Sequence, residues 1–342
     1  MSDLTAESGD GGWPVGRLLL GVALSALFAY LTVRNVDLQR VGAEIADAQL
    51  AVLPASILLQ FAAFGCMTAR SKLVFDGIDD FGLWRLYKSV LVAFVANNPL
   101  PFRAGEFGRV GYLAVHGEDA DPGACLSAVA AERLLDLLVL SLGMVSLVML
   151  AVVDTSRKGI PTATVALGVA AGVGAALGAL ALLGRRPDLF VTVVERVASL
   201  AGESIEDVAG ERARRLTTGL EALGSPMRMA GALAATCAYW GCSIGFFYLW
   251  LAATGIQVPV AAAAAVAVLT AFGTMLPSTP AFVGTYHYFA KISVQMFGVA
   301  AASATTFAVV AHAAAFVPMT LIGSLILAWD DVSLAGDWSP FG

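Results

Sequence analysis

Long uninterrupted runs of apolar residues dominate the chain. A helix needs roughly 20 such residues to cross a 30 Å hydrocarbon core. Runs of about this length or longer cover 16–33, 51–69, 125–153, 159–184, 230–254 and 301–329. The last of these contains His312 as its single ionisable residue, and a helix that is apolar on every face lies in a large core or in a membrane. The pattern therefore predicts an all-α polytopic membrane protein with about six full spans.

Two further apolar runs are too short to cross the bilayer comfortably. Residues 86–98 end in Asn97-Asn98-Pro99-Leu100-Pro101, and residues 261–276 end in Pro277-Ser278-Thr279-Pro280. Proline lacks a backbone donor and disfavours helical geometry in the residue before it, so neither helix can continue. We interpret 86–118 and 261–300 as re-entrant hairpins built from broken helices.

The remaining segments mix charged and apolar residues. Residues 185–229 repeat apolar positions at helical spacing among many charges, which predicts amphipathic helices on the membrane surface. Residues 34–50 have the same character over one short helix. Residues 1–12 and 330–342 are expected to be tails, the first of them disordered. We therefore expect a single transmembrane domain over 13–329.

Composition strengthens this interpretation and limits the function. Hydrophobic residues make up 58% of the 342 residues and charged residues only 13%, against roughly 25% charged in soluble domains. The formal net charge of -6 arises in the two tails, so no face for nucleic acid is expected. No Walker or dinucleotide motif is present, and no cluster has the spacing of metal ligands, so we expect neither cofactor nor metal.

The distribution of lysine and arginine predicts the orientation. Positive residues concentrate on the cytoplasmic side of membrane proteins. With six spans and two re-entrant hairpins, one side receives the seven arginines of 185–229 together with Arg17, Arg70, Lys72, Arg85 and Lys88. The other side receives Arg34, Arg40, Arg157 and Lys158. This predicts a multi-pass protein of the plasma membrane with both termini in the cytoplasm.

The two broken segments resemble each other. Pro101-x-x-x-Gly105 is matched by Pro280-x-x-x-Gly284, and a polar residue follows inside a helix in each case, Glu132 after 27 residues and His312 after 28. Three predicted spans separate the motifs, so the halves would be inverted across the membrane, an architecture that recurs in transporters. The alternative is a chance match, because proline and glycine are common in membrane helices.

The first break contains the densest group of candidate binding residues. Asn97 and Asn98 precede it, and Arg103, Glu106 and Arg109 follow. Arginine is suited to bidentate capture of phosphate or carboxylate, and Glu106 lies three residues from each arginine, where it would hold both when no substrate is bound. The alternative is a purely structural brace made of these three charged residues.

Three ionisable residues lie inside one otherwise apolar helix. Glu132, Arg133 and Asp136 would lie near the middle of the bilayer, where charged groups usually face a cavity or a partner. Arg133 and Asp136 are helical neighbours, which leaves Glu132 to answer Arg103 or Arg109. A substrate or gating role and a structural ion network both remain open.

In the second half, the candidate binding residues around the break are Thr279 and Tyr286, with His312 deep in the last span. A single buried histidine is either a proton relay or a hydrogen-bonded contact between helices, and the second reading is the commoner.

These motifs together are similar to a known family. Asn98-Pro-Leu-Pro-Phe-Arg-Ala-Gly-Glu-Phe-Gly-Arg109, Glu132-Arg133-x-x-Asp136 and Leu276-Pro-Ser-Thr-Pro-Ala-Phe-Val-Gly284, followed by Phe297-Gly298 and His312, resemble the lysylphosphatidylglycerol synthase transmembrane-region family, also called flippase-like domain proteins. The resemblance spans about 16 to 328. Ala281 departs from it, because a glycine is expected there.

The resemblance implies a membrane domain that moves aminoacylated or other anionic lipids between leaflets, fused in relatives to a soluble transferase or linked to lipid-bound sugar pathways. Residues 330–342 are too few for a soluble synthase domain, so we expect a separate synthase or glycosyltransferase partner, and a homodimer is possible. The leading hypothesis is a flippase-like transporter of an anionic, aminoacylated or glycosylated lipid and not an enzyme. The alternatives are an ion-coupled transporter of small solutes and an intramembrane component of a lipid-linked sugar transferase pathway.

Overall fold

The described part of the chain is all-helical. A computed structural model describes residues 15–98, 105–118, 120–149, 224–276 and 279–329, together with a few isolated positions between 167 and 196. Several predictions lie outside these residues: both tails, the first proline turn with Arg103, the span 159–184, and nearly all of 185–223. Helices occupy the predicted spans 16–33, 51–69, 230–254 and 301–329, and the described part of 125–153.

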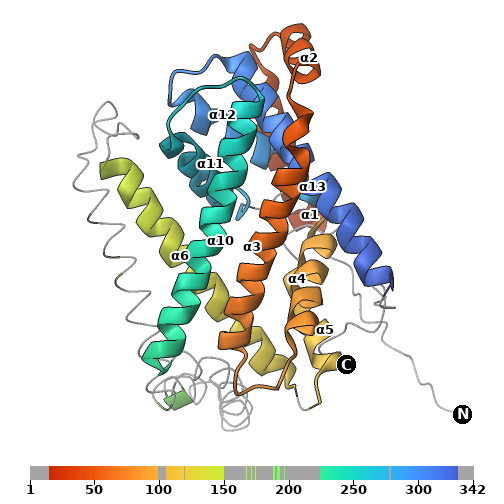
Figure 1. The fold of residues 1–342 in the computed structure, drawn as a ribbon, viewed down its shortest axis with the longest axis vertical. Coiled ribbons are helices and arrows are strands. Elements are labelled where there is room, and N and C mark those ends of the chain that lie inside the picture. Colours follow the sequence, from red (N-terminus) through yellow and green to blue (C-terminus); the bar gives the residue numbers. More distant parts are fainter. Residues whose placement is uncertain are drawn as a thin grey trace, which may run out of the picture.

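Four long helices form the frame of the molecule (Figure 1). They are α3 (Leu53–Val74), α6 (Pro122–Met149), α10 (Pro226–Ala253) and α13 (Ala301–Trp329). Among the described residues, three segments are long and apolar enough to span a membrane: Leu50–Val74, Pro226–Ala253 and Ala301–Trp329. Helix α6 is also 28 residues long, and it carries Glu132, Arg133 and Asp136. The coarse prediction of an α-helical membrane protein is confirmed, and the number of full spans stays a prediction.

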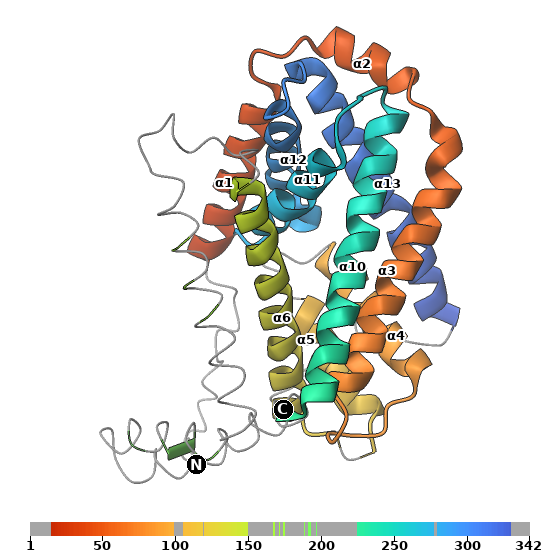
Figure 2. The same ribbon diagram turned by 60° about the vertical axis from the view of Figure 1, so that its left-hand side comes forward.

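The two broken segments form two short helix pairs at opposite ends of the molecule (Figures 1 and 2). The first pair is α4 (Leu83–Asn97) and α5 (Gly105–His116), which pack against each other. The second is α11 (Val260–Gly273) and α12 (Thr285–Gln295), joined through the 3-10 turn η4 (Pro280–Phe282). Each pair lies in its own apolar cluster, the first with α3 and α6, the second with α10 and α13.

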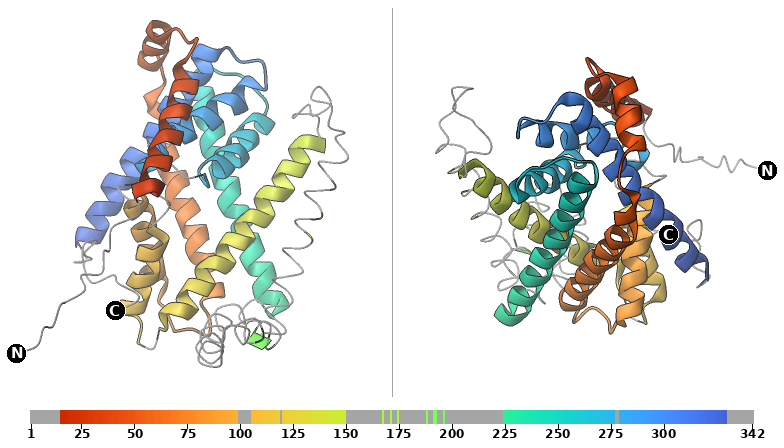
Figure 3. Two further views of the ribbon diagram at one scale, coloured as in Figure 1. Left: turned by 180° about the vertical axis from the view of Figure 1, so that it is seen from behind. Right: turned by 45° about the horizontal axis from the view of Figure 1, so that its top comes forward.

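Local sequence explains where these helices begin and end. The Asp121 carboxylate accepts a hydrogen bond from the Ala124 amide at 2.9 Å, so it caps α6 as the Asp121-Pro122 pair predicts. Helix α2 (Leu38–Ala46) occupies the predicted short helix in 34–50, and Asp37 caps it through the amides of Gln39 and Arg40. Helix α1 (Val15–Val33) packs against α12, as the rear view also shows (Figure 3).

Two predictions of polar segments need correction. The charged stretch predicted over 185–229 ends earlier, because α10 begins at Pro226 and Pro is well suited to a first helical turn. Arg70 was counted among the loop charges, yet it lies inside α3 with no exposed surface. A charged side chain near the end of an apolar run can pair with residues of other helices, as Arg70 does with Asp136, and the sequence alone does not reveal such partners.

The glycines that the two broken segments share have a common cause. A Cβ atom on Gly105 would overlap the Ala93 carbonyl oxygen of α4, and one on Gly284 would overlap the Ser25 carbonyl oxygen of α1. Gly284 also has φ +91°, a conformation that side chains rarely adopt. Both positions therefore require glycine because another backbone approaches them directly. In contrast, a Cβ on Gly108 would meet nothing closer than 3.7 Å.

Candidate functional site

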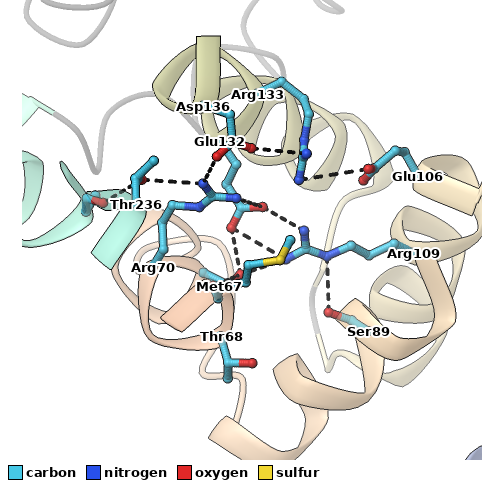
Figure 4. A network of polar contacts seen from close by, with 12 residues as sticks. Met67, Thr68, Arg70, Ser89, Glu106, Arg109, Glu132, Arg133, Asp136 and Thr236 are labelled. Atoms are coloured by element: carbon cyan, nitrogen blue, oxygen red, sulfur yellow. Dashed lines mark hydrogen bonds and ion pairs between the residues drawn. The ribbon is translucent and has the colours of Figure 1, made fainter. Parts of the chain in front are cut away.

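Arg109 of α5 and Glu132 of α6 form the centre of a buried ionic network (Figure 4). Arg109 Nη1 donates to Glu132 Oε2 at 2.6 Å, and its Nη2 lies 2.7 Å from the Ser71 hydroxyl of α3. Arg109 Nε donates to Ser89 of α4 at 3.2 Å, and Ser71 lies 2.6 Å from Glu132 Oε1. One guanidinium thus joins four helices at the first helix pair.

A second arginine extends this network toward α10 (Figure 4). Arg70 Nη1 donates to Asp136 Oδ1 at 2.6 Å and lies 3.4 Å from the Thr236 hydroxyl. Its Nη2 lies 3.6 Å from Glu132 Oε2. The Trp240 indole donates to Asp136 Oδ1 at 3.3 Å. Asp136 is therefore held from three directions by groups of α3, α6 and α10.

The core of the network is buried and balanced in charge. Arg70, Arg109 and Glu132 have no exposed surface, and Asp136 is 3% exposed. Two positive and two negative groups offset each other, which is the usual condition for ionisable groups at membrane depth. Removing one partner from such a set leaves an uncompensated buried charge and is strongly destabilising. We therefore interpret these four residues as a structural frame.

Arg133 and Glu106 lie at the edge of the network and face less protein. Arg133 Nη1 lies 3.1 Å from Asp136 Oδ2, and its Nη2 lies 3.8 Å from Glu106 Oε1. Their side chains are 28% and 19% exposed, whereas those of the network core are 5% exposed or less. The separation between Arg133 and Glu106 is too long for a hydrogen bond. This pair is therefore open to a further partner.

A cavity of about 600 Å³ begins at this edge. Most of its wall is apolar and comes from α3, α4, α10, α11 and α13, with residues such as Phe64, Phe94, Phe247, Ala267 and Phe316. Its polar groups include the two broken-helix asparagines and the edge of the network, namely Asn97, Asn98, Glu106, Arg133 and Asp136. The space thus combines a long apolar surface with charges of both signs in one region.

Several polar atoms of the cavity residues are buried without a hydrogen-bond partner. They are Asn98 Oδ1, Glu106 Oε2, Arg133 Nε and Nη2, and Tyr286 Oη. Buried polar atoms are normally paired, so each such atom calls for an explanation. Their concentration on one cavity offers both donors and acceptors to a molecule that carries charged or hydroxyl groups.

The structure divides the predicted site residues into groups. Those on the cavity are Asn97, Asn98, Glu106, Arg133, Asp136 and Tyr286. Arg109 and Glu132 lie in the buried network and not on the cavity, so direct binding by them is not supported. Arg103 lies outside the described residues. The predicted pairs Arg133–Asp136 and Arg109–Glu132 are both present.

One prediction about the first break was wrong. Glu106 was expected to hold Arg109, yet Arg109 binds Glu132, and Glu106 lies nearest to Arg133. Residues 106 and 109 share a face of α5, but α6 brings a stronger and fully buried partner to the arginine. Interhelical pairing therefore replaced the local pairing that sequence spacing suggested.

The predicted residues of the second half hold a turn together. The Thr279 hydroxyl donates to the Val283 carbonyl at 3.1 Å, and its amide donates to Ser25 of α1 at 2.7 Å. His312 Nε2 lies 2.9 Å from the Ala281 carbonyl oxygen. Ala281 has φ +53°, which favours glycine and explains why the glycine expected at this position would suit the turn. Neither Thr279 nor His312 is among the cavity-lining residues.

Sequence reasoning missed several partners in the network. Arg70, Ser71, Ser89, Thr236 and Trp240 all belong to apolar helices, and none forms part of a recognisable motif. Arg70 offered the one usable signal, because an arginine that follows an apolar run directly can be an intramembrane charge. The hydroxyl residues gave none, since serine and threonine are common in membrane helices and usually bond to their own backbone.

Together, the long apolar helices, the buried ion network and the amphipathic cavity define an α-helical membrane protein with an internal cavity. The chain belongs to the family described as the lysylphosphatidylglycerol synthase TM region, whose model matches residues 18–323. The resemblance recognised in the sequence is thereby confirmed over nearly the full chain. No curated protein and no solved structure matches it significantly.

Proposed function

We propose that this protein is a flippase-like transporter that moves an anionic, aminoacylated or glycosylated lipid between leaflets. The observation that carries the proposal is the cavity, whose wall is mostly apolar and most of whose unpartnered polar atoms gather at one region. A lipid has the same division between acyl chains and headgroup. A small polar solute would leave the apolar wall without a matching surface, so the cavity favours a lipid over the ion-coupled solute alternative.

Arg133 is the headgroup-binding residue in this proposal. Asp136 holds its Nη1, while Nε and Nη2 have no hydrogen-bond partner. A phosphate oxygen fits these two donors, because guanidinium groups bind phosphate in a bidentate manner. Glu106 Oε2 and Asn98 Oδ1 are free to accept from an ammonium or hydroxyl group of the same headgroup. The site therefore suits a headgroup with a phosphate and a nearby donor.

The two helix pairs supply the means of movement in this proposal. We infer that they are re-entrant hairpins of an inverted repeat, each entering the membrane from its own side and ending beside the central cavity. Their positions at opposite ends of the molecule support this (Figure 2). In inverted-repeat transporters, one repeat rocks against the other around a fixed site. The buried network would keep the first pair rigid while the second pair moves.

The remaining elements of the proposal concern the setting. We place the protein in the plasma membrane with both termini in the cytoplasm, and we assign it transport and not bond-making chemistry. The transported lipid would come from a separate synthase or glycosyltransferase.

Lipid movement in proteoliposomes tests the proposal. Wild type, Arg133→Ala and Arg40→Ala would be reconstituted with fluorescent anionic, aminoacylated and glycosylated lipids, and leaflet exposure would be followed by a membrane-impermeant quencher. Arg40 is a matched control because its side chain is 58% exposed on α2, away from the cavity. Loss of a charge-assisted contact is worth about 1.5–3 kcal/mol, so Arg133→Ala should slow movement at least about tenfold.

Three results decide the matter. The proposal is supported if lipid moves faster with wild type than in empty vesicles, if Arg133→Ala slows this movement, and if Arg40→Ala leaves its rate unchanged. Wild type no faster than empty vesicles for every headgroup contradicts transport of lipid. Equal rates for wild type and Arg133→Ala would move the headgroup away from this residue. Mass spectrometry of co-purified lipids then names the headgroup that wild type retains and Arg133→Ala loses.

A further inference from the structure

His312 has a titratable partner that its position in the sequence did not suggest. The rings of His287 in α12 and His312 in α13 lie 4.5 Å apart between centroids. His312 also lies 4.8 Å from the Tyr286 ring and 4.4 Å from the Phe316 ring. Tyr286 and Phe316 both line the cavity. The two imidazoles therefore stand directly behind the wall of the binding site.

The hydrogen bonds of the two histidines show which of their ring nitrogens carry a hydrogen. A carbonyl oxygen can only accept, so His312 Nε2, 2.9 Å from the Ala281 oxygen, carries a hydrogen. The Gly284 amide donates to His287 Nδ1 at 3.4 Å, so the neutral His287 carries its proton on Nε2. In a neutral His312 the lone pair then lies on Nδ1, where it is available to a proton.

Aromatic rings are the part of the surroundings that favours an added positive charge. Cations over the faces of aromatic rings are stabilised, and two such rings contact His312. Within the described residues, the hydrogen bonds and ring contacts of the pair go to Tyr286, Phe316, Ala281 and Gly284, none of which is a carboxylate. The charged residues of the neighbouring elements bind elsewhere: Lys291 of α12 donates to the Thr32 carbonyl of α1 at 2.5 Å, and Glu44 of α2 accepts from Ser303 and Thr306 near the beginning of α13. Helix α11 has no ionisable residue, and α4 meets α13 at Thr320 through Asn98.

The Ala281 carbonyl that His312 holds belongs to a strained turn. Ala281 and Phe282 have φ values of +53° and +57°, and Gly284 follows at +91°. Non-glycine residues persist in this region only when surrounding contacts hold them there. Phe282 lines the cavity, so the conformation of the turn sets the position of part of the cavity wall.

We propose that His312, paired with His287 and enclosed by Tyr286 and Phe316, is a proton-binding site that controls this turn. A proton from water binds Nδ1, and the resulting imidazolium donates a stronger, charge-assisted bond from Nε2 to the Ala281 carbonyl. Loss of the proton weakens that bond and releases the strained turn with Phe282. The pair binds one proton, because a second would place two positive rings side by side. Occupancy of this site would make the shape of the cavity depend on pH.

Nitrogen NMR of histidine-labelled protein in lipid nanodiscs tests proton binding directly. The chain has three histidines, and the third, His116, bonds to the Tyr112 carbonyl on α5. Replacing each histidine in turn by glutamine assigns the signals. Nδ1 of His312 should gain a proton as the pH falls across the range in which the protein stays folded. If it stays unprotonated over that range, or if the proton binds His287 instead, the proposal is wrong.

Hydrogen exchange of the segment 279–287 tests the link to the turn. The ratio of protection in wild type to that in His312→Gln should rise about five- to tenfold as the pH falls through the NMR transition, because charged hydrogen bonds are roughly twice as strong as neutral ones. His116→Gln, the matched control, should behave as wild type. A ratio independent of pH would reduce His312 to a structural contact. Neither readout uses a transported lipid, so these results stand apart from the outcome of the lipid-movement assay.

Discussion

The two short helix pairs share a glycine at their breaks but are held by opposite means. At α4 and α5, buried charges of both signs fix the helices to α3 and α6. At α11 and α12, neutral hydrogen bonds and aromatic contacts hold a turn whose backbone is strained. The first arrangement has one low-energy geometry, because any shift would separate buried charges. The second arrangement holds a turn whose backbone strain at Ala281 and Phe282 would be relieved if its contacts were lost.

This difference suggests a division of labour between the halves. The first pair presents Asn98 Oδ1 and Glu106 Oε2, the atoms proposed to bind a headgroup, at defined positions. The second pair presents Phe282 and Tyr286 at the cavity wall. Apolar contacts are non-directional, so these side chains do not need one fixed position to contact a ligand. A transporter needs both, since binding requires fixed donors and movement requires an element with two accessible states.

The largest expected effect is the loss of Glu132. Glu132→Gln leaves Arg70 and Arg109 without their shared carboxylate and should lower the free energy of unfolding by about 3–5 kcal/mol. His312→Gln, whose amide can still donate to the Ala281 carbonyl in the other half, should cost less than about 1 kcal/mol. Denaturant unfolding in detergent measures both, with the exposed Glu118→Gln as control. Equal costs for Glu132→Gln and His312→Gln would abolish the proposed contrast between the halves.

The shared glycines give the next largest effect. Gly105→Ala and Gly284→Ala each force a methyl group into backbone of a neighbouring helix and should cost about 1–3 kcal/mol. Gly284→Ala should cost more than Gly105→Ala, because alanine must also adopt φ +91° there. Gly108→Ala has space and should change the melting temperature little. A destabilisation by Gly108→Ala as large as that by Gly105→Ala would show that close backbone approach is not the cause.

How far the sequence predicted this molecule depended on the range of the interactions. Proline and glycine placed both breaks, and the Asp121-Pro122 pair placed the beginning of α6, because these signals act within a few residues. The pairing of Glu132 with Arg109 was within reach because both lie in visible motifs. Arg70 and His287 were not recognised as partners, since their roles arise from contacts with residues 66 and 25 positions away, and no local pattern records such distances.

The smallest expected effect lies outside both pairs, at Glu44 of α2. Burial opposes ionisation of this carboxyl, but hydrogen bonds from Arg40, Ser303 and Thr306 outweigh it and lower the pKa. A carboxyl with a depressed folded-state pKa stabilises the fold above its unfolded pKa, and that contribution disappears as the pH falls through the folded one. The melting temperature of wild type should therefore fall more between pH 7 and about 4 than that of Glu44→Gln, by an amount equivalent to less than about 1 kcal/mol. If the melting temperatures of wild type and Glu44→Gln fall in parallel with pH, the hydrogen bonds from Ser303 and Thr306 to Glu44 contribute no pH dependence.

The buried position of Arg70 also constrains how the protein is made. Its carboxylate partner Asp136 is synthesised 66 residues later, so α3 leaves the ribosome with a positive charge that has no counterion. An isolated arginine in a lipid-facing helix is costly, although a position near the helix end, as for Arg70 in α3, lowers that cost because the side chain can reach the interface. The charge of Arg70 is therefore compensated in its buried position only once α6 has supplied Asp136 and Glu132. Biogenesis of the first half is thus coupled across helices, whereas α11, with no ionisable residue, can partition into lipid on its own.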